Sequence, residues 1–176
     1  MKLLLRGAWL AWLALLTGCA GYQLGNIPTG EMKGVRNIWV PMVQNETFTP
    51  YLQSLVTNAL IHEFDNDGTY QTGRAGESEA TLRVTVVKFE RSSVNQNPDN
   101  TTQTTQFRGT LTARATLTNN LTGKEIFKDL EFHGSTDYYV PNFRQGGDNI
   151  EAERQAMPLA GIKLAQNIIH QITEGW

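Results

Sequence analysis

The sequence has almost none of the chemistry that cysteine supplies. Its 176 residues include a single cysteine, Cys19, so the chain can form no internal disulfide and offers no pair of thiolates to a metal ion. Cys19 also lies near the N-terminus, before the segments that can build a core. We therefore expect one domain that folds by packing alone, and no thiolate nucleophile if the thiol of Cys19 is covalently modified.

Catalytic and metal-binding motifs are missing as well. His62, His133 and His170 form neither an H-E-x-x-H motif nor a cluster at metal-ligand spacing. No serine lies in a G-x-S-x-G turn, and no glycine-rich loop follows a predicted strand to hold phosphates. We expect a protein that is not an enzyme, with no catalytic residue, no metal and no cofactor.

The sequence has no excess of basic residues. It contains 15 Lys and Arg against 17 Asp and Glu, a formal net charge of −2. Removal of an N-terminal signal with Lys2 and Arg6 would make the chain more acidic. Nucleic-acid-binding domains show the opposite balance, so no nucleic-acid partner is expected.

The N-terminal apolar run is too short to cross a membrane. Leu3 to Leu16 follows the basic residues Lys2 and Arg6, and its length is typical of the roughly 7–15-residue core of a signal peptide, not of a transmembrane helix of about 20 residues. Leu16-Thr17-Gly18-Cys19 resembles the lipobox of bacterial lipoproteins. That resemblance implies cleavage before Cys19, a diacylglyceryl group on its thiol and fatty acylation, for example by palmitate, of its amino group.

Such a modification divides the chain into three parts: a signal peptide (1–18), a lipidated tether (19–33) and a single domain (34–176). Two or more acyl chains hold a protein stably on a bilayer. Ala20 stands where an Asp would retain an enterobacterial lipoprotein at the inner membrane, so we expect the periplasmic face of the outer membrane. The alternative is an ordinary secretory peptide with a chance cysteine.

The first half of the domain shows strand, helix and strand patterns. Val35 to Val43 is typical of a mostly buried strand, although Pro41 places it at an edge or ends it. Thr49 and Pro50 predict the N-cap and first turn of a helix that continues to Phe64 and ends at Asp65–Gly68. Ala80 to Arg91 alternates with a parity change near Val86, which predicts a β-bulge.

The second half shows two strands and a helix. Ser92 to Gln106 has one apolar residue, which predicts a long hairpin loop or mobile strand ends. Phe107 to Thr118 alternates cleanly, and a turn at 119–123 leads to a strand at 125–133 in which Ile126, Lys128, Leu130 and Phe132 share a side. Residues 134–149 are interpreted as an irregular aromatic loop. An apolar stripe at 152–172 predicts a helix that kinks at Pro158 or begins near it.

These elements predict an α+β fold in the order βαβββα. Two amphipathic helices would pack on one face of a mostly antiparallel four-stranded sheet. The other face would be rich in threonine and arginine.

The remaining candidate functional residues suit binding. Arg83, Arg108 and Arg114 fall on the polar side of their strands, and Lys88 and Arg91 follow the parity change. Guanidinium groups suit bidentate contact with phosphate, and an ammonium group attracts it as a point charge. Lys88, Arg91 and Arg108 are therefore candidate contacts for an anionic headgroup; the alternative is a solvated strand face. Tyr138, Tyr139 and Phe143 would form either a partner contact or a packed loop.

Several segments together resemble one family. Cys19-Ala20-Gly21-Tyr22-Gln23-Leu24-Gly25, the segment from Ile38 to Thr47, the helix from Tyr51 to Phe64 and the terminal helix from Leu159 to Ile172 occur in the same order in the lipopolysaccharide (LPS)-assembly lipoproteins, the LptE-like family. Pro158 departs from that pattern. The resemblance implies two helices on a four-stranded sheet that plugs the outer-membrane β-barrel LptD of Gram-negative bacteria, aids barrel assembly and binds LPS.

Two other classes of function compete with this one. Lipid-anchored periplasmic adaptors that regulate envelope machines such as peptidoglycan synthases also combine a lipobox, a similar strand and a helix, but they carry a longer tether. A lipid-anchored enzyme is the third class, and no motif supports it.

Overall fold

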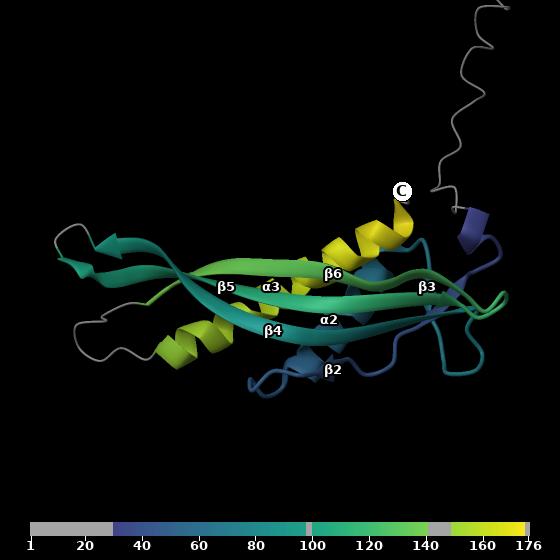
Figure 1. The fold of residues 1–176 in the computed structure, drawn as a ribbon, viewed down its shortest axis with the longest axis horizontal. Helices are drawn as coiled ribbons and strands as arrows, with labels where there is room; N and C mark the ends of the chain where they lie inside the picture. Colours follow the sequence, from purple (N-terminus) through teal and green to yellow (C-terminus); the bar gives the residue numbers. More distant parts are fainter. Residues whose placement is uncertain (1–29, 98–99, 141–148, 175–176) are drawn as a thin grey trace, which may run out of the picture.

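A long, twisted meander of three antiparallel strands forms the centre of the molecule (Figure 1). The computed structural model describes residues 30–97, 100–140 and 149–174. β4 (Ala80–Asn97), β5 (Asn100–Asn119) and β6 (Lys124–Tyr139) are neighbours in the sheet, and β4 and β5 pair from Ala80↔Asn119 to Asn97↔Asn100. β6 stops pairing at Gln106↔Tyr139. The far part of β4 and β5 is therefore a two-stranded ribbon.

Short parallel strands complete a mixed sheet of six strands, which corrects the expected four-stranded, mostly antiparallel sheet. β1 (Asn37–Trp39) pairs in parallel with β3 (Gln71–Thr72) and with β4, and β2 (Gln44–Asn45) pairs in parallel with β4. The chain crosses over through a helix between β1 and β3, and such a crossover returns the strand in the same direction. The alternation of apolar and polar side chains is the same in parallel and antiparallel strands, so it could not predict these parallel pairings.

The predicted strand from Val35 to Val43 is divided into β1 and β2. β1 ends at Trp39 and the chain leaves the ladder around Pro41, which has no N–H to donate. Glu79 fixes the start of β1, since its Oε2 accepts hydrogen bonds from the backbone N–H groups of Asn37 (2.7 Å) and Arg36 (3.2 Å). These bonds hold the pKa of the Glu79 carboxyl below its ordinary value.

Two helices lie on one face of the sheet, as predicted (Figure 1). α2 (Leu52–Asp67) and α3 (Asn149–Thr173) pack against each other, and α3 contacts β5 and β6. Their apolar stripes and the inward side of the strands form one core, whose central members are Val56, Leu60, Phe64, Leu82, Val84, Val86, Leu111, Ala113, Ala115, Leu117, Leu164 and Ile168.

Helix α3 approaches the sheet closely because β6 carries a glycine at the crossing. A Cβ on Gly134 would lie 2.3 Å from the carbonyl oxygen of Ala160 and 2.3 Å from the backbone nitrogen of Leu164. Only a residue without a side chain fits this contact. On the other side of α3, a Cβ on Gly161 would meet the end of the Leu55 side chain at 2.4 Å.

Three local predictions are confirmed. The register between β4 and β5 shifts between Val86 and Lys88, so the parity change does mark a β-bulge. α2 ends at Asp67, and Gly68 follows in the left-handed conformation, with its N–H donating to the carbonyl of Phe64. A turn at 120–123 joins β5 to β6.

The predicted start of the first helix is wrong. The N-cap is Tyr51, not Thr49, and α2 begins at Leu52. Thr49 instead donates its backbone N–H to Oγ1 of Thr47 at 3.2 Å and belongs to the preceding loop. Pro50 therefore also precedes the helix, because the loop has its own side-chain hydrogen bonds.

Strands extend into both segments for which the sequence allows a loop: 92–106, where strand ends hold instead of a long hairpin loop, and 134–149, interpreted as an irregular aromatic loop. β4 and β5 continue through most of the polar region 92–106, and β6 runs on to Tyr139, beyond the predicted end at His133. Residues 98–99 and 141–148, with Phe143, lie outside the described residues. Antiparallel pairing is made by backbone groups, so a strand flanked by a paired neighbour needs few apolar side chains.

The predicted side-chain parity of β6 holds for Leu130 and Phe132, which pair with the core residues Ala115 and Ala113, and is wrong before them. Phe127 and Phe132 are buried, whereas Ile126 and Leu130 are half-buried and Lys128 is exposed. A register irregularity separates the two phenylalanines, and Asp129 has a positive φ of 48° there. One extra residue changes which side chains point to the core.

Helix α3 contains Pro158 within its length. The alternative in which a helix begins near Pro158 is therefore wrong, and the helix runs from Asn149 through this residue.

The chain joins the domain beside the β5–β6 turn. The short 3-10 helix η2 (Gly30–Met32) buries Met32 in the core. Asn119 donates from Nδ2 to the carbonyl oxygen of Glu31 at 2.8 Å, and Lys124 forms an ion pair with the Glu31 carboxylate. This end of the sheet is therefore fixed to residues 30–32, which lie within the segment interpreted as the tether.

Candidate binding surfaces

The sheet face that points away from the helices is polar, as the alternation predicted. On β5 the side chains opposite the core residues are Thr110, Thr112, Arg114, Thr116 and Thr118. Arg83 and Thr85 of β4 pair with Thr116 and Arg114. We call this surface the polar outer face; it includes Lys88 and Arg108.

Charges on the polar outer face are largely compensated within the chain. Lys88 Nζ lies 2.8 Å from Glu90 Oε1, and Arg114 Nη2 lies 3.3 Å from Glu46 Oε2. All four side chains are about half exposed or more. Ion pairs this exposed contribute about 0–1 kcal/mol, so an external anion can compete for the cations.

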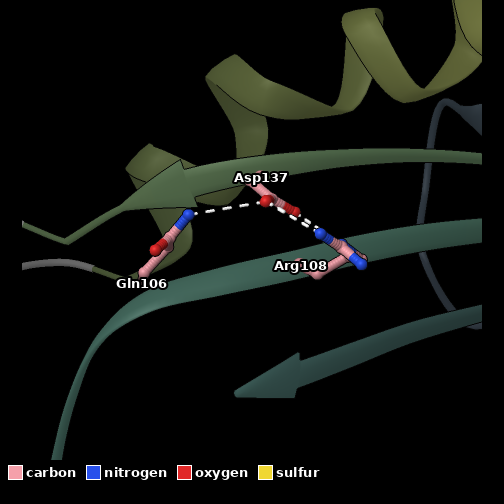
Figure 2. Close-up of polar contacts among 3 residues, drawn as sticks. All are labelled: Gln106, Arg108 and Asp137. Carbon is pink, nitrogen blue, oxygen red and sulfur yellow. Dashed lines mark hydrogen bonds and ion pairs between the residues drawn. The ribbon is translucent and has the colours of Figure 1, made fainter. Parts of the chain in front are cut away.

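The strongest ion pair on this face joins Arg108 of β5 to Asp137 of β6 (Figure 2). Arg108 donates from Nε to Oδ1 at 2.6 Å and from Nη2 to Oδ2 at 3.0 Å, and Gln106 Nε2 adds a longer contact of 3.4 Å to Oδ2. The hydrogen bonds from Arg108 lower the pKa of Asp137, and Asp137 in turn raises the pKa of Arg108. The guanidinium of Arg108 thus already makes the bidentate contact by which arginine binds a carboxylate or a phosphate.

Arg91 lies on the opposite face. It pairs with Gly109, on the side of the sheet that α3 covers. Its Nη1 lies 3.3 Å from Glu153 Oε2 of α3, and its guanidinium carbon lies 5.6 Å from the centre of the Phe107 ring. Arg91 therefore helps to attach the helix to the sheet.

Tyr138 completes this attachment. Its hydroxyl donates to Glu153 Oε2 at 3.2 Å, and its ring stacks on Phe107 with centroids 5.8 Å apart. Burial, followed by the charge of Glu153, raises the pKa of the Tyr138 hydroxyl. Arg91, Phe107, Tyr138 and Glu153 form what we call the distal clamp.

The structure thus separates the three predicted anion contacts. Lys88 pairs with Thr112 and Arg108 with Ser92, which places the two about 13 Å apart along the ladder of the polar outer face. Arg91 lies in the distal clamp. Of the aromatic residues, Tyr138 is packed and Tyr139 is exposed. Cys19 lies outside the described residues.

The three histidines lie on different elements. His62 is exposed on α2, His133 on β6 lies 3.0 Å from Thr112 Oγ1, and His170 on α3 contacts Glu174. In the ranges that the structure describes, no three His, Cys, Asp or Glu side chains are grouped as metal ligands. No helix among these residues has the length and apolarity that a membrane span requires.

Sequence reasoning missed a structured loop between β2 and α2. Asn45 Oδ1 accepts hydrogen bonds from the Thr47 backbone N–H (3.0 Å) and hydroxyl (2.7 Å), while its Nδ2 donates to the Thr49 carbonyl at 2.8 Å. The Asn-x-Thr-x-Thr-Pro pattern could have revealed it, since asparagine and threonine close such turns. The loop displays Phe48 and Tyr51 to solvent.

The family model for lipopolysaccharide assembly, LptE, matches residues 35–172, which span the meander and both helices. The chain belongs to the LptE family. Members of this family are non-enzymatic LPS-assembly lipoproteins of the cell envelope, so the expectation of a protein that is not an enzyme is confirmed. No curated protein matches the sequence.

Solved structures support the same fold. This LptE-family chain is similar to a minor lipoprotein from Acinetobacter baumannii (TM-score 0.52, 14% identity, covering 79% of this chain and 91% of that one). It is also similar to the uncharacterized lipoprotein B from Nitrosomonas europaea (TM-score 0.52, 12% identity, covering 79% of this chain and 83% of that one). A third similar structure is the hypothetical protein CT253 from Chlamydia trachomatis (TM-score 0.54, 9% identity, covering 79% of this chain and 96% of that one). At these identities the likeness concerns the fold alone.

Proposed function

We propose that this LptE-family lipoprotein helps to assemble an LptD-like, LPS-translocating β-barrel, plugs its lumen and binds LPS during insertion into the outer membrane. The family match over residues 35–172 carries the proposal. A lipid on Cys19 would hold the domain at the periplasmic face of that membrane.

The polar outer face supports a position inside a barrel. The lumen of a large outer-membrane barrel is polar and filled with water. A sheet face of threonines, exposed ion pairs and the exposed Arg83 can lie against such a lumen, because its water solvates the charges.

LPS binding is assigned to Lys88 and Arg108, with Arg91 as a third candidate. A phosphate of LPS presents two anionic acceptor oxygens to a guanidinium, as the Asp137 carboxylate does, so it can replace that carboxylate on Arg108. Arg91 holds Glu153 and is less able to turn outward without loosening α3.

Charge reversal separates these roles. Lys88→Glu with Arg108→Glu should weaken LPS binding by about tenfold or more while the domain stays folded, because exposed substitutions change stability by only about 0.5 kcal/mol. Thr85→Glu with Thr118→Glu is a control that adds negative charge elsewhere on the polar outer face. Unchanged LPS binding in the double variant would remove both residues from the site.

The barrel partnership is tested by co-purification from mildly solubilised membranes and by photocrosslinking. A crosslinker at Arg83 on the polar outer face should capture a large barrel protein. A monomer without crosslinks would argue strongly against the plug, and crosslinks to a peptidoglycan synthase would favour the adaptor alternative. Cys19→Ala tests the anchor separately, since the variant should no longer incorporate labelled palmitate.

A further inference from the structure

The loop between β2 and α2 carries the most exposed aromatic side chain among the described residues. Phe48 has a relative exposure of 105% and Tyr51 of 76%. Ile150, also exposed, and the half-buried Met157 line the same open groove of about 350 Å³ beside them, together with Glu153 and Arg154. Isolated exposed apolar residues are common, but a group of this kind marks an interaction surface.

The loop is held rigid. The Asn45 side chain bonds to both Thr47 and Thr49, and the Glu46 backbone N–H donates to the carbonyl of Val86 at 2.9 Å. Tyr51 has a φ of 66°, a left-handed conformation that a tyrosine adopts only when its surroundings enforce it. The aromatic pair is therefore preorganised, and little entropy is lost when it binds.

The tether limits what this surface can meet. Residues 19–29 separate the predicted lipid from Gly30, and eleven residues span at most about 36–40 Å. β1 pairs with Ala80 and β2 with Val86, so the start of the loop lies about 20 Å farther along the sheet than the start of β1. The loop can thus lie in the same membrane plane as the anchor.

We propose that the Phe48–Tyr51 loop inserts into the bilayer to which the lipoprotein is anchored. Phe48 protrudes fully, as a side chain must to pass below the headgroups, and Tyr51 places a ring with a polar tip at headgroup level. The polar outer face then remains in water. This contact belongs to the lipoprotein before it meets a barrel and does not depend on the plug function.

Site-specific labelling tests this contact. Because Cys19 is the only cysteine and lipidation consumes its thiol, one introduced cysteine takes a nitroxide label uniquely. The mature lipoprotein, with its lipid verified by mass, is reconstituted without a barrel into vesicles of phosphatidylethanolamine and phosphatidylglycerol. A label at Phe48→Cys should collide with an aqueous nickel complex at least fivefold less often than a label at Arg83→Cys on the polar outer face.

Equal nickel accessibility at both positions would overturn the proposal. So would protection of position 48 that occurs only when a co-purified barrel is added, since that outcome assigns the loop to a protein partner. A protein that arrives without its lipid mass instead contradicts the anchor in the proposed function, not the loop contact.

Tyr51→Gly provides a second variant that keeps the fold. Glycine adopts a φ of 66° readily, so the unfolding midpoint should not fall, while protection of the label at position 48 should decrease at least twofold. Undiminished protection in this variant would contradict the insertion of Tyr51.

Discussion

The two ends of the meander are stabilised in different ways. Near the β5–β6 turn and through the middle, both helices cover the sheet, and the contacts are apolar side chains with exposures near zero. Towards the ribbon only the first turns of α3 remain. There Glu153 of α3 makes two polar contacts to the sheet, beside a small buried apolar cluster of Tyr138, Val140 and Ala156, while the ring stack and the cation over the Phe107 ring lie within the sheet itself. A large apolar core fixes one end, whereas a small apolar cluster and a polar network fix the other.

This difference matters for a protein that works in an envelope assembly. A packed core resists change because one misplaced methyl group disturbs its neighbours. A network of partly exposed polar contacts can open at a smaller free-energy cost. We expect the α3 N-terminal turns to separate from the sheet before the core does.

The largest effect should come from the closest helix–sheet contact. Gly134→Ala places a Cβ against the α3 backbone, which cannot move away as a side chain can, so the free energy of unfolding in urea should fall by about 3 kcal/mol or more. Gly161→Ala meets only the flexible end of Leu55 and should lose less. Gly30→Ala, with nothing within 4 Å, is the control; equal losses in all three variants would contradict the close approach.

A smaller effect should follow from weakening the distal clamp. Tyr138→Phe removes the hydroxyl that bonds to Glu153 and should lower the free energy of unfolding by about 1 kcal/mol. Amide hydrogen exchange should increase in the first turns of α3 and not in its C-terminal half. Tyr139→Phe, on the exposed neighbour, should change neither measurement; faster exchange along the whole of α3 would show that the two ends unfold together.

The smallest effect concerns the ion pair of Arg108 and Asp137, and it depends on pH. The folded state lowers the pKa of Asp137, so the pair stabilises the protein above the ordinary carboxyl value of 3.8, and this stabilisation is lost as the pH falls through the lower folded value. The stability difference between the native protein and Asp137→Asn should therefore be present at pH 6 and shrink towards pH 3. Urea unfolding at both pH values measures it, and a difference that grows in acid would reverse the assignment.

The sequence by itself determined the strands and helices that show a regular pattern of apolar and polar side chains. The alternation of Leu111 to Leu117 predicted β5 and its polar opposite side, and the parity change at Val86 predicted the bulge, because both depend on neighbouring residues alone. The amphipathic stripes predicted two helices on one face. The lipobox and the order of segments indicated the LptE family.

Only the tertiary structure decided which elements meet. The parallel pairing of β1 and β2 with β4 depends on the helical crossover, and the continuation of the polar strands depends on a paired neighbour. The same holds for the candidate site: the parity change separates Arg91 from Arg108 in the sequence, but only the structure shows that Arg91 meets Glu153 of α3. The bulge and the position of α3 place one guanidinium under the helix and the other on the polar outer face, because one extra residue in a strand reverses the direction of every side chain beyond it.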